Sequence, residues 1–396
     1  MIDTVGEVYK KGQLAARLSY EGNQLKFEYL AEYLSQRHLP IATTLPLSNQ
    51  PLYFSNGASP AFFAGLLPEG RRLSAITNRL KVSLDNDLAV LLEIGADLIG
   101  DVQVLGAGAA PTTDRESLKV PRDLSKASFA KMREEYFGLA STGLPGFQDK
   151  VSSKMLKARA RLANVDYILK FNPQEAPFAV ENEALFLGLA NACGIETANY
   201  KLLTDGLGER ALLLERFDRI ATADSVFRLA AEDGCQVLDL YPANKYDVDF
   251  DLMAQSLISY CSAKPVAGFA LLKQLVFNWL IGNGDAHAKN FSILESVDGS
   301  WRIAPAYDLL CTRFYDDRHM ALAVSDLKTA WNRHLLIELA GRLQVPVKAA
   351  VKVIDHQLSV LQDLSETIRD GALPFRRDQN LETAEFLKKR FRSLAD

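Results

Sequence analysis

The sequence predicts an α+β protein of more than one lobe, with strands concentrated in the first half and helices in the second. Apolar residues alternate between glycine turns over residues 4–29, and compact strand patterns recur at 165–171 and 212–218. From about residue 247 onward, apolar residues recur instead at helical spacing. A chain of 396 residues is also longer than one typical domain, so two or three lobes are expected.

The composition argues against several classes of protein. A net charge of −4 gives no electrostatic basis for broad binding to nucleic acid or to anionic membranes. The four cysteines are scattered without a Cys-x-x-Cys pair, which favours a reducing compartment over a disulfide framework or a zinc site. No secretory signal is found at the start, and no apolar run approaches membrane-spanning length. We therefore expect a soluble, cytoplasmic protein.

Local patterns place the individual elements. In the first half we expect strands at 4–9, 13–20 and 24–29, helices at 60–76 and 84–94, a strand within 95–105, and a linker at 106–113. Pro68-Glu69-Gly70 interrupts the first of these helices. Later helices are expected at 179–193, 250–261, 267–281, 335–343, 347–365 and 381–394.

The most informative stretch is 282–291, which reads Gly-Asn-Gly-Asp-Ala-His-Ala-Lys-Asn-Phe. The glycines end the helix at 267–281, and a hairpin over 291–304 then leads to Asp308. An Asp followed five residues later by an Asn, with a second Asp beyond a hairpin, is the spacing of a protein kinase. There the first Asp accepts the proton of the attacking hydroxyl, and the other two residues hold Mg²⁺. Alternatively, Asn-Gly-Asp is an ordinary turn. The Asp–Asn spacing alone does not exclude that alternative, so the kinase interpretation depends on finding a nucleotide site elsewhere in the chain.

Three stretches could supply that nucleotide site. The loop at 141–150 combines glycines with Lys150, although a simple hairpin loop is the commoner explanation of such a loop taken alone. Lys170 lies on the strand 165–171, ahead of a helix whose Glu181 or Glu183 could pair with it, as in kinases; a solvent-facing lysine is the commoner case. The strand at 212–218 lies where a hinge between two lobes would meet an adenine ring.

Taken in order, these stretches resemble the HipA-like serine/threonine kinases, the toxins of bacterial toxin–antitoxin pairs. The matching stretches are 63–69, 94–100, 144–150, 168–171, 214–219, 232–236, 284–292 and 306–309. The resemblance implies an α+β, two-lobed protein-kinase-like fold with an extra N-terminal β/α subdomain and a helical C-terminal lobe. The corresponding domains are the N-terminal subdomain (1–110), the nucleotide-binding lobe (111–235) and the helical lobe with the catalytic loop (236–396).

The resemblance also implies ATP and Mg²⁺ as cofactors and gives roles to individual residues. Asp285 is expected to be the catalytic acid–base, Asn290 and Asp308 the Mg²⁺ ligands, and Lys170 the phosphate-pairing lysine. A structural histidine is the competing interpretation of His287. The remaining nucleotide contacts expected from the family are Pro145, Gly146, Phe147, Gln148, Asp149 and Lys150 in the loop, Glu215 and Phe217 at the hinge, and His287 and Lys289.

Members of this family carry a regulatory serine that the enzyme itself phosphorylates just before the Gly-x-Gln-x-Lys loop. In one common arrangement that serine would fall at Gly143, so Ser141 and then Thr142 become the candidates for autophosphorylation, with Ser152 and Ser153 as weaker options. A phosphate there would add about −2 charge and could draw the loop away from the nucleotide.

The function that the resemblance implies is a protein serine/threonine kinase acting as a growth-arrest toxin. Its expected partners are a HipB-like helix-turn-helix antitoxin, through which DNA would be contacted, and a protein substrate such as an aminoacyl-tRNA synthetase. No membrane partner is expected. One alternative is a non-catalytic co-repressor that binds the antitoxin. Another is a small-molecule phosphotransferase, which the N-terminal subdomain and the loop sequence disfavour.

Overall fold

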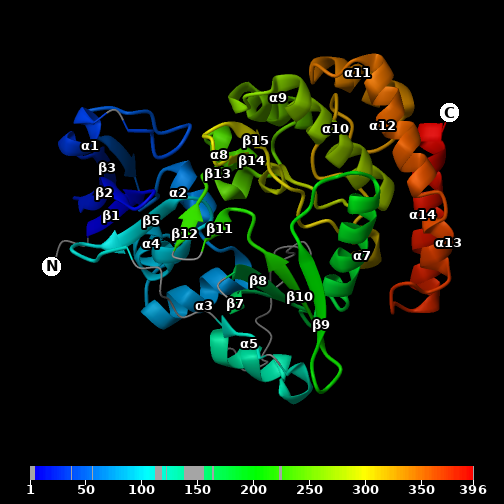
Figure 1. The fold of residues 1–396 in the computed structure, drawn as a ribbon, viewed down its shortest axis with the longest axis horizontal. Coiled ribbons are helices and arrows are strands. Elements are labelled where there is room, and N and C mark those ends of the chain that lie inside the picture. The colour runs from blue at the N-terminus through cyan, green and yellow to red at the C-terminus, as the bar shows by residue number, and fades with distance from the viewer. Residues whose placement is uncertain are drawn as a thin grey trace. The chain divides into compact units, whose positions relative to one another are not determined.

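The computed structural model describes residues 5–36, 38–55, 57–111, 118–121, 123–137, 156–162, 165–222 and 225–395 (Figure 1). The chain forms two compact units, and each is built from segments that are distant in sequence. The first unit contains residues 1–116, 218–245 and 294–299, and the second contains 117–217, 246–293 and 300–396. This division differs from the predicted domains, because residues 218–235 belong to the unit of the N-terminal segment, whereas residues 117–217 belong to the other unit.

An antiparallel sheet of order β4-β3-β2-β1-β5 forms the first unit's framework. The three N-terminal strands confirm the predicted meander, and the turn between β1 and β2 has positive φ at both Lys11 and Gly12, as a type I′ hairpin requires. The five strands are β1 (Val5–Lys10), β2 (Gln13–Glu21), β3 (Gln24–Tyr29), β4 (Leu52–Ser55) and β5 (Val102–Gly106).

Helices complete the first unit and bury its apolar residues, with Leu18, Phe63 and Leu91 fully buried in one core. The predicted helix at 60–76 is two helices with a break around the Pro-Glu-Gly sequence, which confirms the interruption. Asn86 caps the next helix by accepting a hydrogen bond from the Ala89 N–H at 3.1 Å. The helices are α1 (Ala31–Ser35), α2 (Ala61–Leu66), α3 (Gly70–Leu80), α4 (Asp87–Ile94) and α8 (Gly234–Val237).

Hydrogen bonds of charged side chains join residues 218–245 to the N-terminal part of the first unit. The Arg219 guanidinium donates to the carbonyl oxygens of Gly100 at 2.8 Å and Leu98 at 2.6 Å, and Asp218 accepts from the Gly100 N–H at 2.8 Å. These buried, charge-assisted contacts explain why the segment leaves the predicted nucleotide lobe. The shorter elements of this unit are η1 (Gly95–Asp97), β11 (Arg219–Ala221), β12 (Val226–Arg228), β13 (Ala231–Asp233) and η3 (Pro242–Asn244).

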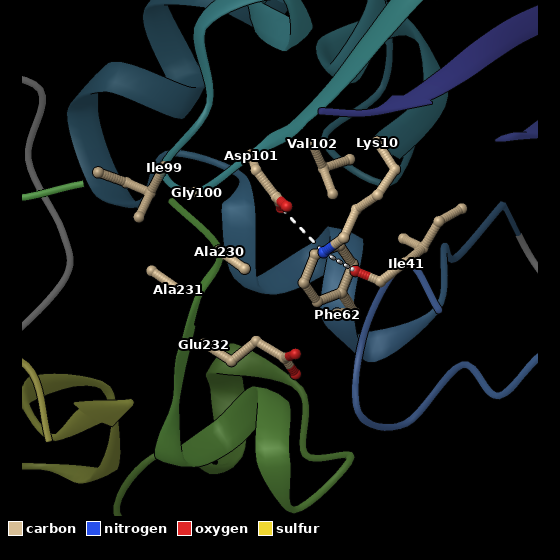
Figure 2. A pocket seen from close by; sticks show the side chains of 10 residues that line it. All are labelled: Lys10, Ile41, Phe62, Ile99, Gly100, Asp101, Val102, Ala230, Ala231 and Glu232. Carbon is tan, nitrogen blue, oxygen red and sulfur yellow. Dashed lines mark hydrogen bonds and ion pairs between the residues drawn. The ribbon is translucent and has the colours of Figure 1, made fainter. Parts of the chain in front are cut away.

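A narrow pocket in the first unit is lined by buried charged side chains (Figure 2). The Lys10 ammonium donates to Asp101 Oδ1 at 2.9 Å and to the Ile41 carbonyl at 3.0 Å. Glu232 accepts hydrogen bonds from the backbone N–H and the hydroxyl of Thr43. None of the sequence-predicted site residues lines this pocket, and its polar contacts are within the first unit.

The second unit begins with a sheet of order β6-β7-β8-β10-β9, and helix α7 (Ala179–Ala192) packs on β9 and β10 (Figure 1). The strand predicted at 165–171 is confirmed as β8 (Val165–Phe171), whereas the strand predicted at 212–218 is β10 (Arg210–Glu215). The other elements of this part are β6 (Leu118–Lys119), η2 (Leu124–Lys126), α5 (Phe129–Phe137), β7 (Leu156–Leu162) and β9 (Tyr200–Thr204).

The remainder of the second unit is helical, as predicted. Helix α10 is its buried centre, where the Trp279 ring stacks on Trp331 with centroids 4.9 Å apart. The helix predicted at 347–365 is two helices, because the chain turns at residues 361–363. The helices are α9 (Phe250–Tyr260), α10 (Lys264–Ile281), α11 (Arg333–Arg342), α12 (Val347–Val360), α13 (Leu364–Arg369) and α14 (Arg377–Ala395). Across the described residues, we find no helix with the length and apolarity needed to cross a membrane.

Candidate active site

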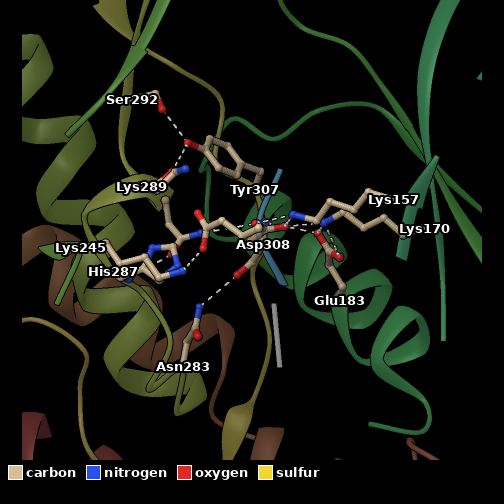
Figure 3. Close-up of polar contacts among 12 residues, drawn as sticks. Lys157, Lys170, Glu183, Lys245, Asn283, His287, Lys289, Ser292, Tyr307 and Asp308 are labelled. Carbon is tan, nitrogen blue, oxygen red and sulfur yellow. Dashed lines mark hydrogen bonds and ion pairs between the residues drawn. The ribbon is translucent and has the colours of Figure 1, made fainter. Parts of the chain in front are cut away.

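The loop after α10 is held by a hydrogen-bonded asparagine and by two glycines. Gly282 ends the helix with φ of +73°, and a Cβ added to Gly284 would lie 2.4 Å from the His319 carbonyl oxygen. The Asn283 side chain accepts from the Asp285 N–H at 3.2 Å. It also donates to the Asp308 carbonyl at 3.2 Å (Figure 3). One amide side chain therefore fixes the backbone beside both aspartates. The loop continues into η4 (Ala288–Asn290), β14 (Ser292–Glu295), β15 (Trp301–Ile303) and η5 (Thr312–Tyr315).

Asp285, the predicted catalytic residue, is buried and has a hydroxyl group in contact with its carboxylate. The Tyr246 hydroxyl donates to Asp285 Oδ1 at 2.8 Å. The Tyr246 ring also meets the buried His287 ring edge to face, with centroids 5.2 Å apart. The ring contact holds His287 beside the carboxylate, and the choice between a phosphate contact and a structural role stays a prediction.

Asn290 and Asp308, the predicted metal ligands, are in contact with each other. Asn290 Nδ2 donates to Asp308 Oδ2 at 3.3 Å, while its Oδ1 accepts from the His287 N–H at 3.0 Å. Asp308 adopts φ of +54°, a left-handed conformation that few residues other than glycine take up, although aspartate is among the more tolerant. Asp308 follows Asn290 by 18 positions, and the hairpin of β14 and β15 between them returns Asp308 to the loop.

Asp308 is also the meeting point of two lysines from neighbouring strands (Figure 3). Lys170 on β8 contacts both Asp308 Oδ1 and the two oxygens of Glu183 on α7, the latter at 2.6 and 2.8 Å. Lys157 on β7 contacts Asp308 Oδ2 at 3.0 Å. Of the two helix acids considered for Lys170, the structure selects Glu183, since Glu181 accepts instead from the Asn172 side chain at 2.9 Å.

These ion pairs determine the charge of the site. Burial would raise the pKa of Asp308, but the ammonium groups of Lys157 and Lys170 outweigh burial and hold that pKa below its usual range. Burial would likewise lower the pKa of Lys170, yet the carboxylates of Asp308 and Glu183 raise it above the ordinary value. The site therefore contains an ionised carboxylate and a protonated lysine around neutral pH. Lys170 is not the solvent-facing lysine of the alternative interpretation, because only 3% of its side chain is exposed.

The predicted hinge residues, Glu215 and Phe217, belong to the second unit. Glu215 ends β10 and accepts from the Asn199 side chain at 3.1 Å. The Phe217 ring lies 5.8 Å from the Tyr307 ring, and the Tyr307 hydroxyl donates to the Lys289 carbonyl at 2.7 Å. Tyr307 thus connects the hinge segment to the loop that carries Asn290, directly before Asp308.

The donor atoms fit Mg²⁺ better than a metal held by protein ligands alone. A carboxylate and an amide are hard oxygen ligands, and Mg²⁺ in kinases is held by one or two such groups together with phosphates and water. Within the described part of the chain, no group of three or more His, Cys, Asp or Glu side chains is arranged to hold a metal ion. Asp308 and Asn290 are the residues that could bind the ion.

Part of the predicted site lies outside the described residues. This part comprises the autophosphorylation candidates and the nucleotide loop: Ser141, Thr142, Ser152, Ser153, Pro145, Gly146, Phe147, Gln148, Asp149 and Lys150. Their roles stay predictions.

Sequence reasoning missed several side chains that the structure brings to the site, namely Lys157, Tyr246, Asn283 and Tyr307. Tyr307 and Asn283 adjoin predicted residues, so their positions in the sequence could have indicated them. Lys157 and Tyr246 carry no comparable signal, because Lys157 is 151 residues from Asp308 and Tyr246 is 39 residues from Asp285.

A lysine–glutamate pair, a loop carrying Asp and Asn, and a second Asp beyond a hairpin define a site of the protein-kinase class. Comparison with known proteins identifies the family. Residues 6–105 match the HipA N-terminal domain, and residues 142–364 match the HipA-like C-terminal domain. The chain belongs to the HipA-like family.

Relatives of known name agree with this assignment. The chain is 31% identical over 342 residues to Y4mE of Sinorhizobium fredii, a protein named as a candidate kinase, covering 80% of this chain and 79% of that protein. It is 29% identical over 317 residues to the serine/threonine-protein kinase toxin HipA of Shewanella oneidensis, covering 74% of this chain and 71% of the toxin.

A solved structure shares the whole fold. The HipA chain in the Shewanella oneidensis complex of HipA, HipB and operator DNA superposes with a TM-score of 0.77, over 98% of this chain and 97% of that one, at 22% identity. At this identity the likeness shows the fold. Together with the relatives, it makes the chain an enzyme of the serine/threonine kinase class with the kinase-like α+β architecture.

Proposed function

We propose that this chain is an ATP- and Mg²⁺-dependent protein serine/threonine kinase that arrests growth as a HipA-like toxin. The observation that carries the proposal is the buried cluster of Lys170, Glu183 and Asp308, in contact with Asn290 and joined through Asn283 to Asp285. Phosphoryl transfer depends mainly on positioning and charge neutralisation, and this cluster provides both.

Asp285 is the group that receives the proton of the attacking hydroxyl. Its carboxylate is held through Oδ1 by the Tyr246 hydroxyl, and its backbone N–H is held by Asn283. A carboxylate held in position beside the loop is the group that would accept the proton of a serine or threonine hydroxyl of a substrate.

Asp308 and Asn290 would hold Mg²⁺, and the ion would supply positive charge to the transferring phosphoryl group. Asp308 is suited to this task because its lysine partners keep it ionised. Lys170 is oriented by Glu183, which leaves its ammonium positioned for phosphate oxygens. Lys150 and the rest of the loop 145–150 would cover the nucleotide, with Glu215 and Phe217 beside adenine and Lys289 near the phosphates.

The biological part of the proposal rests on the relatives. The solved HipA is bound to HipB and operator DNA, so a HipB-like helix-turn-helix protein is the proposed antitoxin of this chain, and DNA contact is through that partner. A component of translation such as an aminoacyl-tRNA synthetase is the proposed substrate. Self-phosphorylation at Ser141, or at Thr142, is the proposed means of inactivation.

The test is transfer of label from radioactive ATP with Mg²⁺, to the protein itself and to a cytosolic extract. Wild type is compared with Asp285→Ala and with a matched control, Asp378→Ala, whose carboxylate is exposed on α14 and ion-paired with Arg376. We expect wild type and the control to transfer label and Asp285→Ala to transfer about 10²- to 10⁴-fold less. Mass spectrometry of the labelled bands identifies the substrate and tests residues 139–155 for the self-phosphorylated site.

Three outcomes separate the alternatives. Transfer to small hydroxyl compounds in place of proteins would favour the small-molecule phosphotransferase. Nucleotide binding without any transfer by the wild type would favour the non-catalytic co-repressor. Label that persists in Asp285→Ala would contradict the assignment of Asp285.

A further inference from the structure

Lys157 and Lys170 are directly opposite each other on paired strands. The antiparallel register of β7 and β8 places Lys157 across from Lys170. Like charges at opposed positions destabilise a sheet unless an anion lies between them. In this structure that anion is Asp308, whose two carboxylate oxygens lie 3.0 and 3.3 Å from the Lys157 ammonium, and whose Oδ1 also contacts the Lys170 ammonium (Figure 3).

The two lysines differ in how firmly they are held. Lys170 is 3% exposed and is anchored by both oxygens of Glu183, as well as by Asp308. Lys157 is 34% exposed, and its ion pair among the described residues is with Asp308. Its ammonium is carried on a flexible four-carbon stem, so it can exchange one anionic partner for another without leaving the site.

The charges of the cluster indicate what that second partner is. Counted with their ordinary charges, the two lysines Lys157 and Lys170 balance the two carboxylates with which the cluster pairs them, Glu183 and Asp308. A divalent cation on Asp308 would add two positive charges and would compete with Lys157 for the carboxylate oxygens. An anion of high charge is then needed beside both lysines and the metal, and the phosphate chain of a nucleotide supplies it.

We propose that Lys157 is a second phosphate-binding lysine of the nucleotide site, paired with Asp308 in the nucleotide-free protein and with the nucleotide's phosphates in the complex. The inference rests on the proposed kinase function and adds to it a residue that determines affinity for polyphosphate. It assigns Lys157 no role in recognising the adenosine part of the nucleotide.

Binding measurements separate these two parts of the ligand. Isothermal titration calorimetry with Mg²⁺ gives the affinities of the full chain for ATP and for adenosine, in wild type, Lys157→Gln and Lys157→Arg. A matched control is Lys201→Gln, which neutralises an exposed lysine on β9 of the same sheet. We expect Lys157→Gln to bind ATP about tenfold more weakly, the scale of one charge-assisted hydrogen bond. Its affinity for adenosine stays unchanged, Lys157→Arg retains most ATP affinity, and Lys201→Gln matches wild type.

The outcomes distinguish this inference from the proposed function. Wild type that binds ATP, with Lys157→Gln binding it equally well, overturns the role of Lys157 and leaves the kinase proposal intact. An equal loss of ATP and adenosine affinity also overturns it, because Lys157 would then support the fold of the site. Wild type that binds no ATP overturns the proposed function and the inference together.

Discussion

The buried ion pair of Lys170 and Glu183 makes a quantitative prediction about stability. Both side chains are almost fully buried, with exposed fractions of 3% and 0%. Lys170→Met leaves the carboxylates of Glu183 and Asp308 with Lys157 as their remaining cation. Removing one partner from a buried ion pair reduces the free energy of unfolding by about 3–5 kcal/mol. Glu183→Gln costs less, about 1–3 kcal/mol, since Lys170 keeps Asp308 as its partner.

The double variant Lys170→Met/Glu183→Gln tests the physical reason for this loss. It removes one charge of each sign, and Lys157 still balances Asp308. We therefore expect it to be more stable than the sum of the single effects predicts, by at least about 1 kcal/mol. Urea unfolding followed by tryptophan fluorescence is a suitable assay, because all three tryptophans, at 279, 301 and 331, belong to the second unit.

Lys201→Met serves as the control, because this lysine is exposed on the same sheet. Exposed substitutions of this kind usually change the free energy of unfolding by less than about 0.5 kcal/mol. If Lys170→Met destabilises the protein no more than Lys201→Met does, the argument from buried charge is refuted. Additive effects in the double variant would show that the pair does not act as a unit.

Three further predictions concern other parts of the second unit. Tyr246→Phe removes the hydrogen bond to Asp285; we expect phosphoryl transfer to fall about tenfold while ATP affinity by calorimetry is unchanged. Gly268→Ala places a Cβ 1.9 Å from an opposing carbonyl oxygen, so we expect it to lower the midpoint of urea unfolding. In Gly341→Ala the added Cβ meets nothing within 4 Å, and we expect the free energy of unfolding to rise by about 0.5–1 kcal/mol. Burial raises the pKa of Cys311 to about 12, so this thiol stays protonated at pH 8. We therefore expect iodoacetamide to label Cys311 at least about tenfold more slowly in the folded protein than in the urea-unfolded protein.

Each of these has a result that would count against it. Equal transfer rates in Tyr246→Phe and wild type would mean that the hydroxyl does not orient Asp285. A stabilised Gly268→Ala variant would contradict the close approach of helix α10 to its neighbour. Rapid labelling of Cys311, mapped by mass spectrometry of the folded protein, would contradict its complete burial.

Much of the fold follows from local patterns in the sequence. The meander at residues 5–29, the strand at 165–171 and the helices from 250 onward match the structure closely, because alternation, helical periodicity and glycine turns act over a few residues. The incorrect predictions also come from patterns that act over a few residues. A helix predicted at 347–365 is divided in the structure, since continuous apolar periodicity does not reveal a turn that tertiary packing introduces.

The sequence alone also indicated where the candidate chemistry lies. Asp285, Asn290 and Asp308 were recognisable because a helix end, a loop and a hairpin bring them together within one short unit. The sequence did not decide whether Glu181 or Glu183 pairs with Lys170. Residues two positions apart in a helix, such as Glu181 and Glu183, point about 200° apart around its axis. One of them therefore faces Lys170 and the other does not, and the packing of α7 decides which one.

By itself, therefore, the sequence determined the helices and strands, and it determined which site residues are brought together by the short stretch of chain between them. The tertiary structure decided the contacts between distant segments: Lys157 and Lys170 on Asp308, and residues 218–245 with the first unit. Strand register places Lys157 opposite Lys170, and the folding of the chain brings Asp308 to them from 138 residues beyond Lys170. The physical reason is that turn and periodicity signals extend over one element, whereas burial and charge pairing depend on every segment that surrounds a side chain.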